Sequence, residues 1–339
     1  MAYDFKTNGL VKYAIKKGGS IKPLIVDSTL TGGTGLMNPS VFVDDDKSIY
    51  CIIRNTNYIL NHSEHAVYHQ KYGPLQYLHP EGDQTLRTIN YIAKLNPDLD
   101  IEYCHKIDTS RFDKKPIWEF HGNEDARLFK WNKKYYMCGV RRDDNTTGIG
   151  RMELSEIKFN EESANEVKRY KIPAPNEKDN PYCEKNWMPV LDKPYHWIKW
   201  TDPTELVNYN KKTKKTKIIK SAEHIFSTDN NFNFRGGGQV LQLGDGCWLA
   251  LTHETELWND QLQRKNGHYY HRFLLWDKEW NLIKTGQQFN FLTGLIEFAV
   301  GIAIHDSNLL ISFGFQDNAA YILSMPLECL NELFKRDNI

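Results

Sequence analysis

The sequence predicts an all-β protein, specifically a five-bladed β-propeller, because one hairpin pattern recurs five times along the chain. Each copy has a polar cluster, an apolar strand, a tight turn rich in Asp, Asn, Gly, Lys or Pro, and a second apolar strand. A single hairpin cannot bury its own face, so hairpins that repeat at this spacing are expected to stack radially as blades of about four strands.

The five hairpins follow one another in order. Their first strands are predicted at 41–43, 128–131, 189–191, 239–243 and 297–304, and their second strands at 49–53, 135–140, 195–200, 247–252 and 309–314. The polar clusters precede the first four of these strands, and the fifth strand begins with its own polar residue, Glu297. Further strands are predicted at 88–95, 153–159, 273–276 and 280–283. Apolar residues at helical spacing behind Pro326 predict a short C-terminal helix. Five blades need nearly all 339 residues, so residues 1–339 are expected to form one domain.

The polar residue that opens each hairpin is expected at the same end of an innermost strand. These residues would then meet at one mouth of a central channel; they are Asn38, Asp125, Lys185, Arg235 and Glu297. A β-sandwich with ordinary Asx turns at these positions is the alternative.

Charge and cysteine content restrict the class of protein. The 43 Lys and Arg residues equal the 43 Asp and Glu residues, and this balance disfavours a dedicated nucleic-acid binder. The lysine run 211–217 is expected to be a solvated hairpin between outer strands, with a patch for an anionic polymer as the alternative. The six cysteines show no metal spacing, and the N-terminus shows no signal sequence, so a soluble cytoplasmic protein with reduced thiols is expected.

Two other segments were considered as ligand sites. The glycine-rich run 31–35 lacks the Lys-Ser/Thr of a P-loop and is expected to be a turn that leads to Asn38. The insertion that carries His62, His65 and His69 is expected to be a loop over the channel mouth, with a metal site as the alternative. No cofactor is predicted.

Asp125 is the strongest candidate for a catalytic residue. Carboxylates can bind sugar hydroxyls and exchange a proton with a glycosidic oxygen, and the charge of Glu124 beside it is expected to raise the pKa of Asp125. Cations at the same mouth can hold a phosphate group. The expected phosphate- or donor-binding residues are Lys185, Arg235 and Arg272.

These motifs carry a family resemblance. The order Asn38-Pro39, Arg54, Glu124-Asp125-Ala126-Arg127, Lys185 and Gly314-Phe315-Gln316-Asp317 resembles the five-bladed β-mannoside phosphorylases and hydrolases of glycoside hydrolase family 130 and their β-1,2-mannosyltransferase relatives, over residues 38–325. The resemblance implies that Asp125 is the general acid, that Asn38, Arg54 and Asp317 hold the reacting sugar, and that Lys185 binds phosphate. Ala126 stands where the family usually has proline, and several later segments look more like a divergent group of putative glycosyltransferases on the same propeller.

Together these observations lead to one functional hypothesis and three alternatives. The hypothesis is an inverting glycosyltransferase that moves a sugar from a nucleotide- or phosphate-linked donor to a carbohydrate or other hydroxyl acceptor. The alternatives are a β-mannoside phosphorylase or hydrolase, a non-catalytic glycan-binding propeller, and a glycosyltransferase that acts on modified nucleic acid. The expected substrate-binding residues are Asn38, Arg54, Glu124, Arg127, Asn186, Trp187, His253, Glu254, Tyr270, Glu297 and Asp317.

Overall fold

The computed structural model describes most of the chain. The described residues are 3–32, 35–60, 68–70, 73–77, 85–117, 119–144, 146–175, 182–222, 234–259 and 265–335. None of the described helices is long and apolar enough to cross a membrane. All six cysteines have free thiols.

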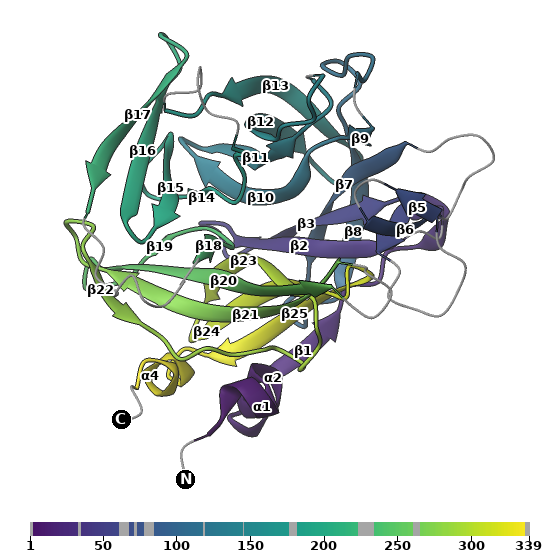
Figure 1. Cartoon of the computed structure of the whole chain (residues 1–339). Helices are drawn as coiled ribbons and strands as arrows, with labels where there is room; N and C mark the ends of the chain where they lie inside the picture. Colours follow the sequence, from purple (N-terminus) through teal and green to yellow (C-terminus); the bar gives the residue numbers. More distant parts are fainter. Residues whose placement is uncertain are drawn as a thin grey trace.

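The chain folds as a five-bladed β-propeller, as the sequence predicts, and its blades follow one another around a ring (Figure 1). Each blade has four antiparallel positions, counted from the innermost strand outward, and the outermost strands of blades 1 and 2 also pair in parallel, which joins these two blades into one sheet. Blade 1 contains β2 (Leu36–Val43), β3 (Ile49–Thr56), β7 (Leu86–Leu95) and β8 (Ile101–Asp108). Blade 2 contains β10 (Glu124–Trp131), β11 (Lys134–Arg141), β12 (Arg151–Phe159) and β13 (Ala164–Ile172). Blade 3 contains β14 (Met188–Pro189), β15 (His196–Thr201), β16 (Thr204–Asn210) and β17 (Lys215–Ser221).

Blades 4 and 5 complete the ring. In blade 4 two short pieces share the innermost position, so that it contains β18 (Arg235–Gly236), β19 (Leu241–Gln242), β20 (Trp248–Asn259), β21 (Lys265–Trp276) and β22 (Leu282–Thr285). Blade 5 contains β23 (Glu297–His305), β24 (Asn308–Phe315), β25 (Ala319–Pro326) and β1 (Ser20–Pro23). Because β1 comes from the start of the chain and pairs with β25, Ser20 opposite Ser324, the N-terminal segment closes the ring.

The five hairpins of the sequence are the two innermost strands of the five blades. Their apolar residues pack between neighbouring blades, and the largest aromatic residues at one such contact, Trp131, Trp187 and Trp197, are almost fully buried. The centre of the channel is filled by a polar side chain. The buried Gln239 Nε2 donates to the carbonyl oxygens of Val41 (3.0 Å) and Leu128, and its Oε1 accepts from the amide of Ile302 (3.1 Å). The side-chain amide of Gln239, which belongs to blade 4, therefore links this blade to blades 1, 2 and 5.

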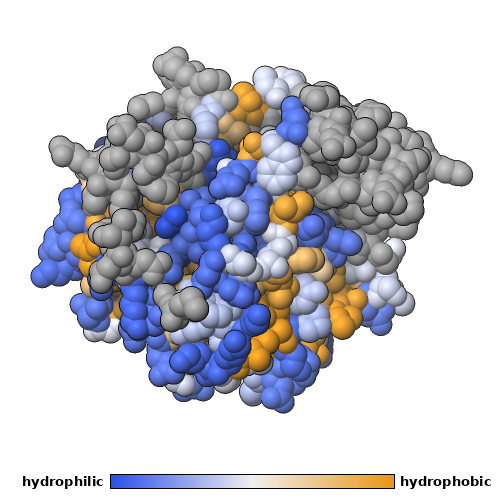
Figure 2. Space-filling view, turned by 60° about the horizontal axis from the view of Figure 1, so that its bottom comes forward, coloured by the Kyte–Doolittle hydropathy of each residue, from blue (hydrophilic) through white to orange (hydrophobic). Residues whose placement is uncertain are grey.

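Shorter elements lie outside the blades. They are α1 (Phe5–Asn8), α2 (Leu10–Lys16), α3 (Ser28–Thr31), α4 (Cys329–Leu333), a small sheet of β4 (Tyr58–Leu60), β5 (Tyr68–Gln70) and β6 (Gly73–Tyr77), and β9 (Phe120–His121), which pairs in parallel with β7. The expected C-terminal helix is α4, which packs Leu330 and Leu333 on the apolar core of blades 4 and 5. Figure 2, which brings the side with α1, α2 and α4 forward, shows a mainly hydrophilic surface with apolar side chains among the polar ones.

The lysine run forms the β16–β17 hairpin at the outer edge of blade 3, as expected. Asn210 accepts two backbone hydrogen bonds at the start of its turn, and the ammonium group of Lys211 lies 4.0 Å from the ring centre of Tyr195. At least one lysine of the run is therefore used in packing within the blade.

Candidate active site

A cavity of about 340 Å³ lies at one mouth of the channel, where all five blades contribute side chains. Its lining residues are Met37, Asn38, Arg54, Tyr58, Phe120, Glu124, Asp125, Arg142, Lys185, Asn186, His253, Tyr269, Ile296, Phe298 and Asp317. The structure thus brings together Asn38, Asp125 and Lys185 from three different hairpins, although Asp125 lies 87 residues after Asn38 and 60 residues before Lys185. A larger depression of about 550 Å³ lies among the hairpin turns at the opposite end, where Lys130 is paired with Asp44 and Asp45. We place the site at the first mouth because acids and cations face one space there.

Backbone conformation directs several of these side chains into the cavity. Asn38, Asp125, Asn186 and Asp317 all have positive φ, between 47° and 63°. Left-handed backbone is uncommon for residues with a side chain and accumulates at functional sites. The pairing of β2 with β3 and of β10 with β11 also shifts register at Asn38 and at Asp125. Bulges of this kind re-aim side chains at the end of a strand.

Asp125 is held as a carboxylate by blade 1. Its Oδ1 accepts hydrogen bonds from Asn38 Nδ2 (2.8 Å) and from a guanidinium nitrogen of Arg54 (2.7 Å). Burial raises the pKa of Asp125, but the charges of Arg54 and Arg127 and the two hydrogen bonds outweigh burial, so the pKa lies below its usual value. The expectation that Glu124 raises the pKa of Asp125 is therefore wrong. The Glu124 carboxylate is instead paired with Arg142 Nε at 3.3 Å.

Asp317 enters the same cavity from blade 5, and its pKa is shifted in the direction opposite to that of Asp125. Burial raises its pKa to about 6, the charge of Asp125 adds to this, and Arg54 opposes it. No described residue donates a hydrogen bond to the Asp317 carboxyl group. Two carboxyl groups whose environments separate their pKa values are the arrangement expected of an acid and a base that work together.

Arg54 organises this part of the site. Its guanidinium group is buried and donates to Thr88 Oγ1 (3.1 Å), to Asp125 and to the hydroxyl group of Tyr58 (2.9 Å). Arg127, by contrast, is fully buried and donates to the carbonyl oxygens of Gly237 and Asp125 and to Asn186 Oδ1. Arg127 therefore supports the cavity floor and does not line the cavity.

Lys185 and Arg235 are the cations best placed to meet an anion. Lys185 lines the cavity and forms no ion pair with any described carboxylate. Arg235 does not line the cavity, but it lies beside the lining residue His253, with which it is paired across β18 and β20. Its buried Nε has no hydrogen-bond partner among the described residues. Burial, followed by the charges of nearby cations that include Lys185 and Arg235, holds the pKa of His253 well below its usual value. The imidazole is thus neutral, and it stacks on the ring of Tyr269.

Seven of the expected residues do not line the cavity, namely Arg127, Trp187, Arg235, Glu254, Tyr270, Arg272 and Glu297. Arg272 is ion-paired with Glu254, which also accepts a hydrogen bond from Gln288. Trp187 is buried between blades and donates to Glu184, and Tyr270 is bonded to His268. Glu297 is fully buried and accepts hydrogen bonds from the amides of Phe291, Leu292 and Gly294. Its contacts are those of a residue that organises the preceding loop.

Other cavity residues were not expected from the sequence. Tyr269 and Phe298 lie next to the expected Tyr270 and Glu297, and Arg142 and Tyr58 come from the ends of the first two hairpins. Adjacent residues of a strand point to opposite faces, so a one-residue error in register selects the wrong side chain. Arg142 directly follows the second strand of its hairpin, and this position is the sequence feature that could have predicted it as a lining residue.

No metal site is found in the part of the chain that the structure describes, where three His, Cys, Asp or Glu side chains nowhere gather closely enough. His62, His65 and the side chain of His69 lie outside the described residues, so the alternative of a metal site in that insertion stays a hypothesis.

Comparisons with known proteins place this geometry among solved structures. No protein-family model and no curated protein matches the sequence. The fold is similar to a β-1,2-mannobiose phosphorylase from Listeria innocua in complex with β-1,2-mannobiose, at 14% identity over 92% of this chain and 93% of that chain, with a TM-score of 0.54. It is also similar to MPT-1, a GDP-Man-dependent mannosyltransferase from Leishmania mexicana, at 11% identity over 91% of this chain and 90% of that chain, with a TM-score of 0.54.

A third similar structure is MPT-4, a mannose phosphorylase from Leishmania mexicana in complex with phosphate ion, at 11% identity over 96% of this chain and 97% of that chain, with a TM-score of 0.52. At these identities the likeness establishes the fold. It extends over nearly the whole chain in every case, which agrees with a propeller built from all five blades.

Proposed function

We propose that this chain is an inverting glycosyl-transfer enzyme that uses an activated sugar donor, with Asp125 as its acid/base residue. The observation that carries the proposal is the pair of carboxyl groups, Asp125 and Asp317, in one cavity that also contains Lys185. A non-catalytic glycan-binding site has no need for two carboxyl groups with separated pKa values or for a cation without a carboxylate partner.

Asp125 is suited to accept a proton from the acceptor hydroxyl. Only Oδ1 is hydrogen-bonded to described residues, by Asn38 and Arg54, so Oδ2 can take the proton. The acceptor oxygen then attacks the anomeric carbon as the bond to the leaving group breaks on the opposite face, which inverts the configuration. The leaving phosphate or diphosphate departs with its negative charge, which Lys185 and Arg235 can stabilise.

The donor is proposed to be a mannosyl nucleotide or mannosyl phosphate. This choice rests on the three similar structures, whose descriptions name mannobiose, GDP-mannose and phosphate. The acceptor is proposed to be a carbohydrate hydroxyl group. Transfer to a modified nucleic acid is not favoured, because at least one lysine of the 211–217 hairpin packs on a tyrosine of its own blade.

A phosphorylase of β-mannosides is the second candidate, because the same unpaired cations fit inorganic phosphate as well as a leaving phosphate. In that direction phosphate attacks the anomeric carbon and a protonated carboxyl group must supply the proton to the glycosidic oxygen. The two reactions share a site and differ in the preferred donor.

A thermal-shift screen tests the proposal and separates these two candidates. A ligand that binds the native state raises the melting temperature, and the stabilisation grows with the logarithm of ligand concentration divided by the dissociation constant. We expect GDP-mannose or mannose 1-phosphate to stabilise the protein, followed by release of GDP or phosphate when an acceptor sugar is added. Stabilisation only by β-1,2-mannobiose together with phosphate would favour the phosphorylase, and no response to any sugar ligand would contradict both.

A further inference from the structure

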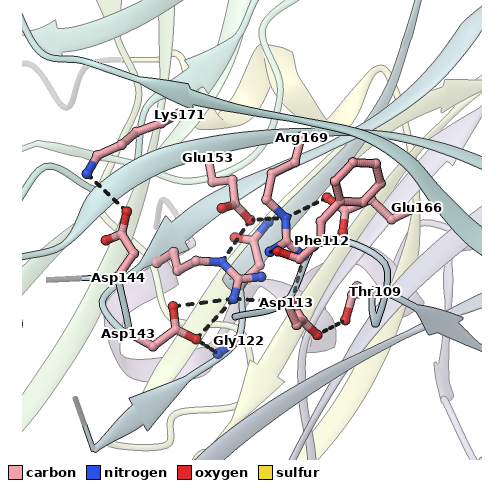
Figure 3. A network of polar contacts seen from close by, with 12 residues as sticks. Thr109, Phe112, Asp113, Gly122, Asp143, Asp144, Glu153, Glu166, Arg169 and Lys171 are labelled. Carbon is pink, nitrogen blue, oxygen red and sulfur yellow. Dashed lines mark hydrogen bonds and ion pairs between the residues drawn. The ribbon is translucent and has the colours of Figure 1, made fainter. Parts of the chain in front are cut away.

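A network of ion pairs and hydrogen bonds runs from the outer strands of blade 2 to Gly122 (Figure 3). Gly122 precedes Glu124 and Asp125 by two and three residues. The Gly122 amide donates a 2.9 Å hydrogen bond to Oδ2 of Asp143. Gly122 has a φ of 93° and packs so closely on blade 1 that an added Cβ would lie 2.2 Å from the Thr88 carbonyl oxygen. Neither the conformation nor the space admits another residue there.

The segment is held from both sides. On the blade 1 side, Asn90 Nδ2 donates to the carbonyl oxygen of Asn123 at 2.8 Å. On the blade 2 side, the Gly122 amide is bonded to the Asp143 carboxylate, and Glu124 pairs with Val140 of β11 and with the side chain of Arg142. Asp125 follows three residues later, so the position of Gly122 limits where the Asp125 carboxylate can lie.

Asp143 is itself anchored. One guanidinium nitrogen of Arg141 lies 3.0 Å and 3.3 Å from its two carboxylate oxygens, and its carbonyl oxygen accepts from the amide of Ile117. Both side chains are only 9% exposed. Charge-assisted hydrogen bonds between buried groups are stronger and more directional than exposed ones.

Arg141 is fixed in turn by the next members of the network. Its Nε donates to Glu153 at 2.9 Å, and Arg169 reaches Glu153 (3.6 Å), Glu166 and Asp113. Four carboxyl groups thus share two guanidinium groups. In keeping with this excess of acid, burial raises the pKa of Glu153 to about 7 against the charges of Arg141 and Arg169, and the charge of Glu166 adds to the effect.

The network and the active site lie on opposite sides of one wall. Asn123 and Arg141 line a separate cavity of about 340 Å³ between blades 1 and 2, whereas their sequence neighbours Glu124 and Arg142 line the active-site cavity. Neighbouring residues of an extended segment face opposite sides, so a displacement of one side moves the other.

From these contacts we propose that Asp143, fixed by Arg141, is a positioning residue for Asp125. Asp143 does not touch the active-site cavity, and its effect on the reaction passes through the Gly122 amide and the segment 122–125. This inference rests on the proposed function, since it assigns Asp125 the chemistry that Asp143 supports.

The test compares Asp143→Ala with Asp143→Asn in the full chain, with GDP-mannose and mannose 1-phosphate as donors. Alanine removes the acceptor for Gly122, and a misplacement of about 1 Å can cost about 100-fold in rate, so we expect kcat to fall about 10- to 100-fold with donor KM nearly unchanged. Asparagine still offers an oxygen to the Gly122 amide, and Arg141 is still paired with Glu153. The kcat of Asp143→Asn should therefore be close to that of the wild type and well above that of Asp143→Ala. Equal losses in both variants, or a change confined to KM, would contradict the proposal.

A matched control and a second measurement keep this result separate from the proposed function. Asp144→Asn alters the neighbouring acid, whose contact with Lys171 is at the surface, and it should leave kcat unchanged. Amide hydrogen exchange at Gly122 needs no substrate and should become at least about tenfold faster in Asp143→Ala but not in Asp144→Asn. If the wild-type protein turns over neither donor, the proposed function fails. If amide exchange at Gly122 is unchanged in Asp143→Ala, the positioning role of Asp143 fails, whatever the activity.

Discussion

Arg54 of blade 1 and Asp125 of blade 2 are joined by a 2.7 Å hydrogen bond that reaches only Oδ1 of the carboxylate. The bond keeps Asp125 ionised although it is buried, because the guanidinium charge offsets the cost of desolvation. The other oxygen stays available for a proton. One contact between two blades therefore sets both the charge and the orientation of the proposed catalytic group.

The first prediction concerns Asp317. Its pKa rises from 3.8 to about 6 in the folded protein, so the folded state binds this proton more tightly than the unfolded state. Tighter proton binding by folded Asp317 stabilises the protein below pH 3.8, and this stabilisation is lost as the pH rises through about 6. The free energy of unfolding should differ by about 3 kcal/mol between the two ends of this range. We expect Asp317→Asn to raise the melting temperature at pH 8 and to leave it nearly unchanged at pH 3.5.

Activity supplies the counterpart of that measurement. If Asp317 serves the reaction, the stabilised Asp317→Asn protein should lose turnover, since functional sites often cost stability. If the melting temperature of Asp317→Asn equals that of the wild type at pH 8 as well as at pH 3.5, the raised pKa of Asp317 is contradicted.

The second prediction separates Arg235 from Arg272. The Nε of Arg235 is buried near His253 and has no hydrogen-bond partner among the described residues, whereas Arg272 is paired with Glu254. Arg235→Ala should therefore weaken mannose 1-phosphate binding at least about tenfold and leave a neutral mannoside little affected. Isothermal titration of both ligands checks this. Equal weakening of the two ligands would mean that Arg235 has a structural role.

Arg272→Ala is the comparison variant. It leaves the Glu254 carboxylate buried without its cation, so we expect it to lower the melting temperature. The ratio of phosphate-bearing to neutral ligand affinity should stay as in the wild type. A selective loss of phosphate binding would return Arg272 to the set of donor-binding residues.

The third prediction concerns Glu297. Its carboxylate accepts three backbone hydrogen bonds in the loop before β23, and its side chain is fully buried. Glu297→Ala leaves these amides without their acceptor, and we expect a loss of about 3 kcal/mol in the free energy of unfolding. Urea unfolding measures this loss, and activity per folded molecule should remain. Loss of turnover without loss of stability would point to a role in the reaction.

Some of the site could be predicted because it depends on local pattern. Alternating apolar residues and turn residues locate each hairpin, and the polar residue before it locates Asn38, Asp125 and Lys185 at the channel mouth. The closure of the ring by β1 could not be predicted in the same way, because its partner β25 lies some three hundred residues away and pairing at that distance leaves no local signal.

The finer arrangement of side chains also depends on features that the sequence does not display. Positive φ turns Asp125, at a bulge, and Asp317, in the turn between β24 and β25, into the cavity. A one-residue change of register separates the lining residue Tyr269 from Tyr270. The sequence suggests the wrong direction for the pKa of Asp125, because Glu124 is its neighbour in sequence, whereas Arg54 is its neighbour in space. The pKa of a buried group depends on the charges that lie near it in the folded protein, whatever their distance along the sequence.

The central claim is that Asp125 exchanges the proton during glycosyl transfer. Asp125→Asn keeps an oxygen that can accept from Asn38 and Arg54 but cannot exchange a proton, so its fold and donor binding should be retained. Glu124→Gln, which alters the acid paired with Arg142, is the matched variant and should have a milder effect.

The most direct measurement is turnover of the donor found by thermal shift, at saturating donor and acceptor, for wild type, Asp125→Asn and Glu124→Gln. A general acid or base contributes roughly 10²- to 10⁴-fold to rate. The account predicts that Asp125→Asn loses turnover by that factor while it binds donor and melts close to the wild-type temperature. An Asp125→Asn protein with near wild-type turnover, or one that loses stability but keeps its activity per folded molecule, would contradict the account.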